Sequence, residues 1–430
     1  MTGAVRIRPR PVRTLLAGLA LLAAPAHLAA ARAPRRHEPA PSRPAGPAFD
    51  VRPGVEVLAE RGFAPLAGKR VGLLTNATGV TRDGRRTADV LRSEEARRAG
   101  VSLLRLFSPE HGLGASADEE VPDSVDPGTG LPVVSLYGAK RRPSPADLAG
   151  LDAVVVDLQD AGCRFYTYLT TLGYLMEEAA RAGVGVVLLD RPNPIGADVV
   201  EGPLADDLSF TAYHRIPVRP GMTIGELARL FASERTPGVA LTVVAMASYR
   251  RSLWYDETGI PWVDPSPNLR SVTAAALYPG VALLELTNVS VGRGTGTPFE
   301  VVGAPWVDAA VLSRTLSVRR VPGVRFAPVT FRPGSGPHAG ALCRGVRIGV
   351  VDRAAIRPVA LGIEIASALR DLHPREWDAS RFGTLLASRG ALARFSRGES
   401  ASQVVAGWAG ELAEFERRRA AVLLYEPPGR

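Results

Sequence analysis

The fold of this 430-residue chain is decided by residues 153–190, in which two apolar runs, AVVVDL at 153–158 and VGVVLLD at 184–190, flank a helical stretch. The helical stretch, 171–182, ends before Gly183, and glycine is the residue that most often follows a helix end. Near-continuous Val and Leu runs separated by helices are typical of parallel strands that are buried on both faces. This unit therefore predicts an α/β fold with a parallel sheet.

Three more strands precede this unit and extend the same pattern. They are predicted at 70–76 (RVGLLTN), 101–107 and 132–137, with a helix at 87–99 between the first two. Five strands that alternate with helices predict a Rossmann-like three-layer sandwich with a mostly parallel sheet. We expect this domain to span residues 49–274.

The character of the sequence changes from about residue 275, where longer, glycine-rich loops separate shorter apolar runs. A strand-like run at 345–351 is followed by two predicted helices, 355–372 and 401–424, in which apolar residues recur at spacings of three and four. These elements predict a smaller C-terminal α+β domain over residues 275–430.

The first 33 residues carry the marks of a secretory signal peptide. Four arginines, the last at Arg13, precede an apolar core at 15–24, and the alanine-rich residues 29–33 offer a cleavage site. The apolar core is shorter than the roughly 20 residues that span a membrane, so we expect no stable membrane insertion after cleavage. The Pro-, Ala- and Arg-rich residues 34–48 predict a disordered tether. We therefore expect an exported protein, periplasmic or extracellular.

The net charge of +9 does not indicate a nucleic-acid partner. Eight arginines within residues 1–50, against Glu38 and Asp50, account for six of those nine charges, and the rest are scattered. Cys163 and Cys343 are the only cysteines, and we expect two unpaired buried thiols. The six histidines show no metal-ligand spacing, so we expect no metal and no cofactor.

Polar side chains follow the ends of all five predicted strands. The pentapeptide SPEHG at 108–112 places the carboxylate of Glu110 directly after the second strand. The carboxyl ends of parallel strands meet at one edge of a sheet, and ligands bind there in the crevice between the diverging loops. The polar residues expected at this edge are Asn76, Glu110, Tyr137, Asp157, Asp160, Asp190, Arg191 and Asn193.

Motifs of two common activities on such a sheet are missing. The first strand is followed by neither G-x-G-x-x-G nor a Walker lysine, and the chain has no G-x-S-x-G. Paired carboxylates remain, and glycoside cleavage uses one as an acid and usually a second as nucleophile or base. Glu110 is the leading catalytic candidate, with Asp157, Asp160 or Glu285 as its partner. The alternative for Asp157 and Asp160 is a structural role, in capping a helix or bonding loop amides.

Three arginines and two tyrosines bear on the class of substrate. Arg164 and Arg191 follow strand ends, and Arg293 lies in the glycine-rich loop. Each can bind an acidic group through a bidentate fork, or form an internal ion pair with Asp160 or Asp190 instead. Tyr168, with Tyr166 close by, offers an aromatic face on which a sugar can stack, unless both rings belong to the core.

A series of short motifs makes the chain resemble the NamZ-type exo-β-N-acetylmuramidases from about residue 50 to residue 425. Each motif is short, but their order along the chain is highly specific. The motifs are LTN at 74–76, SPEHG at 108–112, DLQDAGCRFYTY at 157–168, DRPNP at 190–194, EGP at 201–203, GMTIGELA at 221–228, PSPN at 265–268, GRGT at 292–295, PFE at 298–300 and GAPW at 303–306.

The resemblance implies a Rossmann-like catalytic domain and a C-terminal domain. The active site is then expected in the cleft between the two domains, which the C-terminal domain closes. The resemblance also implies a glycoside hydrolase that releases N-acetylmuramic acid from the non-reducing end of peptidoglycan-derived muropeptides or disaccharides. Glu110 matches the family's proposed catalytic glutamate, and the lactyl carboxylate of the sugar is a natural target for the arginines. The residues expected to bind substrate are Asn76, His111, Arg164, Tyr168, Arg191, Asn193, Asn268 and Arg293.

The chain departs from the family pattern at three points. After Gly112 it reads LGAS, where the family has an arginine-glycine pair and a longer loop, while Pro220 replaces a common histidine and Leu286 a small residue. Because Glu110 is retained, we expect the chemistry to survive and the sugar or aglycone preference to shift. The altered loop also motivates a rival hypothesis, a non-catalytic cell-wall sugar-binding protein on the same fold.

Overall fold

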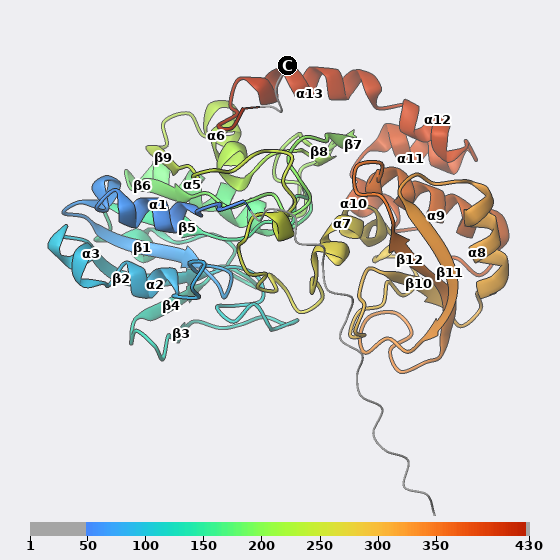
Figure 1. The fold of residues 1–430 in the computed structure, drawn as a ribbon, viewed down its shortest axis with the longest axis horizontal. Helices are drawn as coiled ribbons and strands as arrows, with labels where there is room; N and C mark the ends of the chain where they lie inside the picture. Colours follow the sequence, from blue (N-terminus) through green and yellow to red (C-terminus); the bar gives the residue numbers. More distant parts are fainter. Residues whose placement is uncertain (1–48, 427–430) are drawn as a thin grey trace, which may run out of the picture. The chain divides into compact units, whose positions relative to one another are not determined.

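The computed structural model describes residues 49–426, so the predicted signal peptide and tether lie outside the described residues. Its main element is a seven-stranded sheet (Figure 1). All neighbouring strands are parallel except β3, which runs antiparallel to β4. In spatial order the strands are β3 (Ser124–Val125), β4 (Pro132–Ser135), β2 (Ser102–Ser108), β1 (Arg70–Thr75), β5 (Ala153–Asp157), β6 (Gly185–Leu189) and β9 (Leu241–Val244).

The five predicted strands are confirmed as β1, β2, β4, β5 and β6, each within two residues of its expected bounds. The order of the sheet reverses at β1, because β2 and β4 lie on one side of it and β5 and β6 on the other. Such a reversal opens a crevice at the carboxyl ends of the strands. The loop that carries Glu110 leaves β2 at this edge.

Alternate side chains of the strands belong to two separate cores, so the sheet is covered on both faces. Val154 and Val156 share a core with residues of α5 and α6, whereas Val155 shares the second core with residues of α1, α2 and α3. The covering helices are α1 (Gly54–Glu60), α2 (Thr87–Val90), α3 (Glu94–Arg98), α4 (Pro145–Leu148), α5 (Tyr168–Ala182) and α6 (Ile224–Glu234).

The C-terminal part of the chain combines a small antiparallel sheet, ordered β10-β12-β11, with a set of helices (Figure 1). Its core is continuous with that of α5 and α6, so hydrophobic contacts join the two parts. Its elements are α7 (Val272–Val281), β10 (Val301–Ala304), α8 (Ala309–Val318), β11 (Val324–Phe331), β12 (Cys343–Val350), α9 (Pro358–Leu372), α10 (Gly383–Leu386), α11 (Arg389–Ser396), α12 (Ala401–Ala406) and α13 (Ala409–Ala420). A two-stranded ribbon of β7 (Glu201–Leu204) and β8 (Pro217–Arg219) precedes it.

Two predicted helices are wrong in the same way, because each is broken in two. The stretch 87–99 forms α2 and α3, and Ser93 starts the second helix by accepting a hydrogen bond from the backbone N–H of Ala96. The stretch 401–424 forms α12 and α13, with Gly407 and Trp408 between them. The turn at Gly407 brings the Trp408 ring inward, where it is buried.

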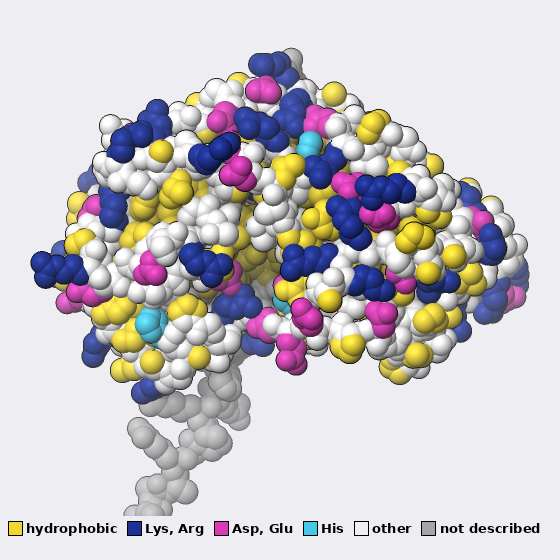
Figure 2. All heavy atoms as spheres, turned by 180° about the vertical axis from the view of Figure 1, so that it is seen from behind, with side chains coloured by type: hydrophobic (Ala, Val, Ile, Leu, Met, Phe, Trp, Pro, Cys, Tyr) yellow, Lys and Arg dark blue, Asp and Glu magenta, His cyan; other side chains and the backbone are white. Residues whose placement is uncertain are grey.

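Three further expectations concern thiols, membranes and surface charge. Cys163 and Cys343 are both free and buried, as expected. Within residues 49–426, no helix combines the length and the apolar character needed to cross a membrane. On the face drawn in Figure 2, Lys and Arg side chains are interspersed with Asp and Glu over the whole surface.

Candidate active site

A pocket of about 260 Å³ lies where the loops after β2 and β5 meet the C-terminal part of the chain. This volume is on the scale of a single sugar residue. Polar, aromatic and aliphatic side chains contribute to its wall. The lining residues are Glu110, His111, Phe165, Tyr166, Thr167, Thr211, Ser266, Asn268, Tyr278, Glu285, Leu286, Arg293, Phe299 and Leu385.

A tight turn presents Glu110 to this pocket. The strand β2 ends at Ser108, and Pro109, which lacks a backbone N–H, does not extend the pairing with β4. His111 and Gly112 follow with φ of 70° each, in the left-handed region that residues other than glycine seldom adopt. An unusual backbone conformation of this kind is common beside catalytic groups.

Three hydroxyl groups surround Glu110. The Thr167 hydroxyl donates a hydrogen bond to Glu110 Oε2, and the Tyr168 hydroxyl lies 3.5 Å from the Glu110 backbone oxygen. Burial raises the pKa of Tyr137 to about 12, and a hydrogen bond to Glu110 adds to the increase. Tyr137 therefore keeps its proton near neutral pH and faces Glu110 as a donor. These contacts hold the Glu110 carboxyl group in one orientation.

Glu285 is the second glutamate of the pocket and follows the short helix η3 (Ala282–Leu284). Burial raises its pKa, the nearby carboxylates of Asp118 and Glu110 raise it further, and Arg293 opposes the change. The structure therefore brings Glu110 and Glu285 together, as one of the predicted pairs requires.

Arg293, Asn268 and His111 also line the pocket, as their predicted role in substrate binding requires. Arg293 donates to Glu285 Oε1 through Nη1 and to Asp118 Oδ1 through Nη2, the latter over 3.0 Å. The amide of Asn268 donates to Asp118 Oδ2 over 3.2 Å and accepts from the backbone N–H of Gly294. The binding role of these residues stays a prediction.

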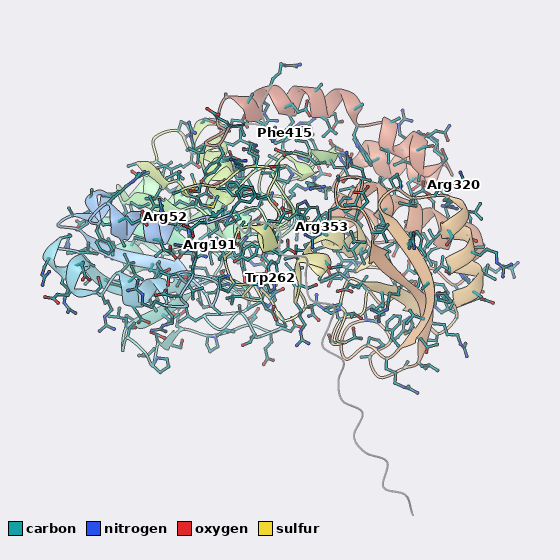
Figure 3. The ribbon with its side chains drawn as sticks, in the orientation of Figure 1. Arg52, Arg191, Trp262, Arg320, Arg353 and Phe415 are labelled. Carbon is teal, nitrogen blue, oxygen red and sulfur yellow. The ribbon has the colours of Figure 1, made fainter. Side chains whose placement is uncertain are left out.

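Asp157 and Arg191 lie outside the pocket lining, where they are bonded to each other. Both side chains are about 1% exposed, and two guanidinium nitrogens of Arg191 contact the two carboxylate oxygens of Asp157. Thr87 also donates to Asp157. Arg191 lies in the N-terminal part of the chain, at the side of the large sheet (Figure 3). Arg191 therefore forms an internal ion pair, as the alternative interpretation has it, but with Asp157 and not with Asp160 or Asp190. Asp157 binds side chains, and not the loop amides or the helix end that its own alternative named.

Asp160 and Asn193 stabilise loops behind the pocket. Asp160 is buried, its Oδ2 accepts the backbone N–H of Gly162 over 2.6 Å, and burial raises its pKa to about 7. Asn193 donates to the carbonyl of Met222 and accepts from the backbone N–H of Ile195. Neither residue lines the pocket, and both are engaged with the backbone.

Arg164 does not reach the pocket, because backbone carbonyl groups take its donors. Its Nη1 donates to Pro203 and Ile216 and its Nη2 to Leu385 and Leu386, so it connects the two parts of the chain. Burial lowers its pKa to about 10. The guanidinium therefore stays charged near neutral pH, although it has no carboxylate in direct contact among the described residues.

Asn76 and Tyr168 form a buried layer behind Glu110. Asn76 Nδ2 donates to the Tyr168 hydroxyl over 2.7 Å, and that hydroxyl also contacts the carbonyl of Pro265. Neither residue lines the pocket, whereas the neighbouring Tyr166 does. Tyr168 therefore supports the Glu110 loop from behind, and its ring packs edge-on against Tyr166.

Sequence reasoning missed Thr167, Asp118 and Tyr278. Thr167 lies inside the DLQDAGCRFYTY motif, and its position next to Tyr168 was the available signal. Tyr278 lies in α7 among apolar residues and resembles a core residue. Asp118 belongs to the loop that departs from the family pattern, and no sequence signal distinguishes it from its acidic neighbours Glu119 and Glu120. Within residues 49–426, no group of three or more His, Cys, Asp or Glu side chains is arranged to hold a metal ion.

A small pocket at the edge of an α/β sheet, lined by two glutamates, has the paired carboxyl groups that a glycoside hydrolase uses. A family model described as exo-beta-N-acetylmuramidase NamZ, N-terminal, matches residues 71–273, and its C-terminal counterpart matches residues 276–425. The chain therefore belongs to the NamZ family of exo-β-N-acetylmuramidases.

The chain is also similar in sequence and in structure to known proteins. The chain is 38% identical over 382 residues to the peptidoglycan beta-N-acetylmuramidase NamZ of Bacillus subtilis (strain 168), covering 87% of this chain and 91% of that protein. Two crystal structures of DUF1343 family proteins from Bacteroides fragilis share the fold. They have TM-scores of 0.81 and 0.69 and identities of 35% and 29%, and each comparison covers 88% of this chain and all of the other.

Proposed function

We propose that this chain is an exported exo-β-N-acetylmuramidase that removes N-acetylmuramic acid from the non-reducing end of peptidoglycan fragments. Membership of the NamZ family and the named activity of the Bacillus subtilis relative support the reaction. The arginine-rich start and apolar core of residues 1–33 support export. The substrates are muropeptides or disaccharides that end in N-acetylmuramic acid.

The observation that carries this proposal is that Glu110 and Glu285 line the same small pocket. A pocket with room for one sugar favours cleavage at a chain end, because the rest of the glycan has to stay outside. A pocket that contains carboxyl groups offers acid catalysis in addition to binding, which favours the enzyme over the rival sugar-binding protein.

In the proposed reaction Glu110 is the general acid, which protonates the oxygen of the departing sugar. The group that assists at the anomeric carbon is Glu285 or the 2-acetamido group of the substrate itself. Thr167 and Tyr137 orient Glu110 through their hydroxyl groups. Asp157 and Asp160, the other predicted partners, lie outside the pocket lining and have no part in this scheme.

The first prediction tests the acid role of Glu110. The substitution Glu110→Gln keeps the shape of the side chain but removes its proton, so turnover of an N-acetylmuramic acid–N-acetylglucosamine disaccharide should fall by roughly 10²- to 10⁴-fold. Turnover of the p-nitrophenyl glycoside of N-acetylmuramic acid should fall less than that of the disaccharide, because nitrophenolate is a good leaving group that needs little protonation. Initial rates on both substrates provide the measurement.

The matched control is Glu119→Gln, which makes the same change at an exposed position and should keep wild-type rates. Equal rates for Glu110→Gln and the wild type would overturn the assignment.

Fragments that begin with N-acetylglucosamine should resist the enzyme, and mass spectrometry should detect N-acetylmuramic acid as the only sugar released. Calorimetry that shows tight fragment binding without release, by the wild type and Glu110→Gln alike, would favour the sugar-binding protein.

A further inference from the structure

Asp118 forms an ion pair with Arg293, an arginine that lines the pocket. Among the residues that line the pocket, Arg293 is the one lysine or arginine. Its Nη1 is taken by Glu285, which also lines the pocket, and its Nη2 donates to Asp118 Oδ1 over 3.0 Å. Asp118 is absent from the lining and reaches Arg293 from the loop that follows Gly112.

Both oxygens of the Asp118 carboxylate are bound. Oδ2 accepts the amide of Asn268 over 3.2 Å, and Oδ1 lies 3.9 Å from Nδ1 of His111. A guanidinium and an amide that donate to the two oxygens of one carboxylate form a carboxylate-recognition site. Asp118, Asn268 and Arg293 lie on three separate loops.

The charges around the pocket oppose an acidic substrate in this arrangement. Glu285 and Asp118 share a single guanidinium, and Glu110 lines the same pocket. The lactyl ether of an N-acetylmuramic acid that carries no stem peptide would bring a fourth carboxylate. Of the three protein carboxylates, Asp118 is the one that can leave, because its side chain is 38% exposed whereas that of Glu285 is 17% exposed. Breaking an exposed ion pair costs little free energy, whereas breaking a buried one costs much more.

We infer, on the basis of the proposed function, that Asp118 is an internal competitor for the lactyl carboxylate of the substrate. On binding, the lactyl carboxylate takes the place of the Asp118 carboxylate on Arg293 and Asn268, and Asp118 moves into solvent. A neutral sugar has no group to exchange for Asp118. The exchange therefore makes Arg293 and Asn268 the determinants that select N-acetylmuramic acid over N-acetylglucosamine, and makes Asp118 the residue that sets KM.

The substitution Asp118→Asn tests the exchange, because it removes the competing charge and keeps the shape. Calorimetry should show N-acetylmuramic acid bound roughly two- to fivefold more tightly than by the wild type, the range expected for loss of an exposed ion pair. KM for the p-nitrophenyl glycoside should fall by the same factor, while kcat and the binding of N-acetylglucosamine stay the same. The neighbouring Glu119→Gln corrects for the general effect of removing a negative charge from this loop.

A second variant tests whether Arg293 is the group that binds the lactyl carboxylate. Arg293→Gln should weaken N-acetylmuramic acid binding on the order of 30-fold or more and leave N-acetylglucosamine binding near the wild-type value. Circular dichroism establishes that this variant is folded. If both sugars lose affinity equally in the folded variant, Arg293 does not select the carboxylate and the inference fails.

The carboxylate can come from the lactyl group or from an attached peptide, and a third ligand separates the two sources. In N-acetylmuramoyl-L-alanyl-D-isoglutamine the lactyl carboxyl group is an amide, so Asp118→Asn should give this ligand no gain. An equal gain for this ligand would overturn the assignment to the lactyl carboxylate. Unchanged N-acetylmuramic acid binding in an active Asp118→Asn enzyme would overturn the exchange itself. If the wild type releases no sugar although binding shifts as expected, the proposed function fails and the exchange stands.

Discussion

Acidic residues of similar sequence context have different roles in this protein because their surroundings differ. Glu110 and Glu285 face the pocket, Asp157 is neutralised by Arg191, and Asp160 is buried against the backbone. Burial raises the pKa of Asp160 to about 7, so its carboxyl group carries a proton over much of the acidic range. The residue therefore affects stability more directly than catalysis.

Asp160→Asn should change how stability depends on pH. Between the ordinary pKa of an aspartate, near 4, and the raised pKa of about 7, the unfolded chain is ionised at this position while the folded chain holds a proton. Rising pH therefore favours the unfolded wild type, whose free energy of unfolding should fall relative to the variant by up to about 4 kcal/mol between pH 4 and pH 8.

Urea denaturation of the wild type and Asp160→Asn at both pH values provides the measurement. The two proteins should have similar midpoints near pH 4, and the variant should be the more stable near pH 8. The exposed Asp207→Asn serves as the control and should differ little from the wild type at either pH. A constant difference between wild type and Asp160→Asn across the range would contradict the prediction.

At the scale of elements, the crossing of α7 and α9 determines where Glu285 lies. The two helices approach at Gly280 and Gly362, where a Cβ on Gly280 would lie 1.7 Å from the carbonyl oxygen of Pro358 and a Cβ on Gly362 would lie 2.4 Å from that of Gly280. The helix α7 runs directly into η3, and Glu285 follows. Close contact between the two helices therefore holds the second glutamate at the pocket.

Gly280→Ala should force these helices apart. The added methyl group would overlap the backbone of α9, which cannot rotate away as a side chain can, so stability should fall by at least about 2–3 kcal/mol. Turnover should fall as well, because Glu285 would shift with α7. The measurements are the urea midpoint and kcat on the same preparation.

The control for this substitution is Gly410→Ala on α13, where the added methyl group meets nothing within 4 Å. It should be neutral or stabilising by up to about 1 kcal/mol, because alanine favours the helix. Equal effects of the two substitutions would show that helix propensity, and not the crossing, governs the response.

At the scale of the whole molecule, the C-terminal segment returns to the large sheet and ties the two parts together. Phe415 on α13 is fully buried and lies on the inner side of that helix (Figure 3). The Tyr425 hydroxyl donates to Asp190 Oδ2 over 2.7 Å and accepts the backbone N–H of Met246 over 2.8 Å. Together with the bonds from Arg164 to the carbonyl groups of Leu385 and Leu386, these contacts join segments that are far apart in the sequence.

Tyr425→Phe should therefore destabilise the molecule as a whole. The substitution leaves the buried N–H of Met246 without its partner and removes one of the two hydroxyl donors to Asp190 Oδ2, the other being that of Thr223. Together these losses should lower the free energy of unfolding by about 2–3 kcal/mol. Catalysis in the folded protein should change little, because Tyr425 does not line the pocket. Thermal unfolding and kcat at 25 °C separate the two effects.

The control is Tyr255→Phe, which removes a single 3.2 Å hydrogen bond to the carbonyl of Pro261 and should cost about 1 kcal/mol. A Tyr425→Phe protein as stable as this control would show that the C-terminal segment is not an anchor.

Local sequence was enough to determine five of the seven strands of the large sheet and the position of the leading catalytic candidate, whereas the edge strands β3 and β9 were not predicted. The Val and Leu runs at β1, β2, β5 and β6 are long and apolar because both faces of the sheet are buried, and that requirement is visible in each run by itself. The turn SPEHG likewise shows where β2 must end and that Glu110 follows it. The breaks inside the predicted helices were not visible, because Ser93 and Trp408 act through capping and burial in the folded chain.

Only the tertiary structure decided which polar groups share the pocket. Glu285 faces Glu110 because α7 crosses α9, whereas Asp157 and Arg191 neutralise each other and Arg164 binds four carbonyl groups. Asp118 reaches Arg293 from a loop whose sequence has no distinguishing feature. The spacing of residues along a chain reports local conformation, but the partner and the burial of a charged group are set by contacts between distant segments, and these form only when the chain folds.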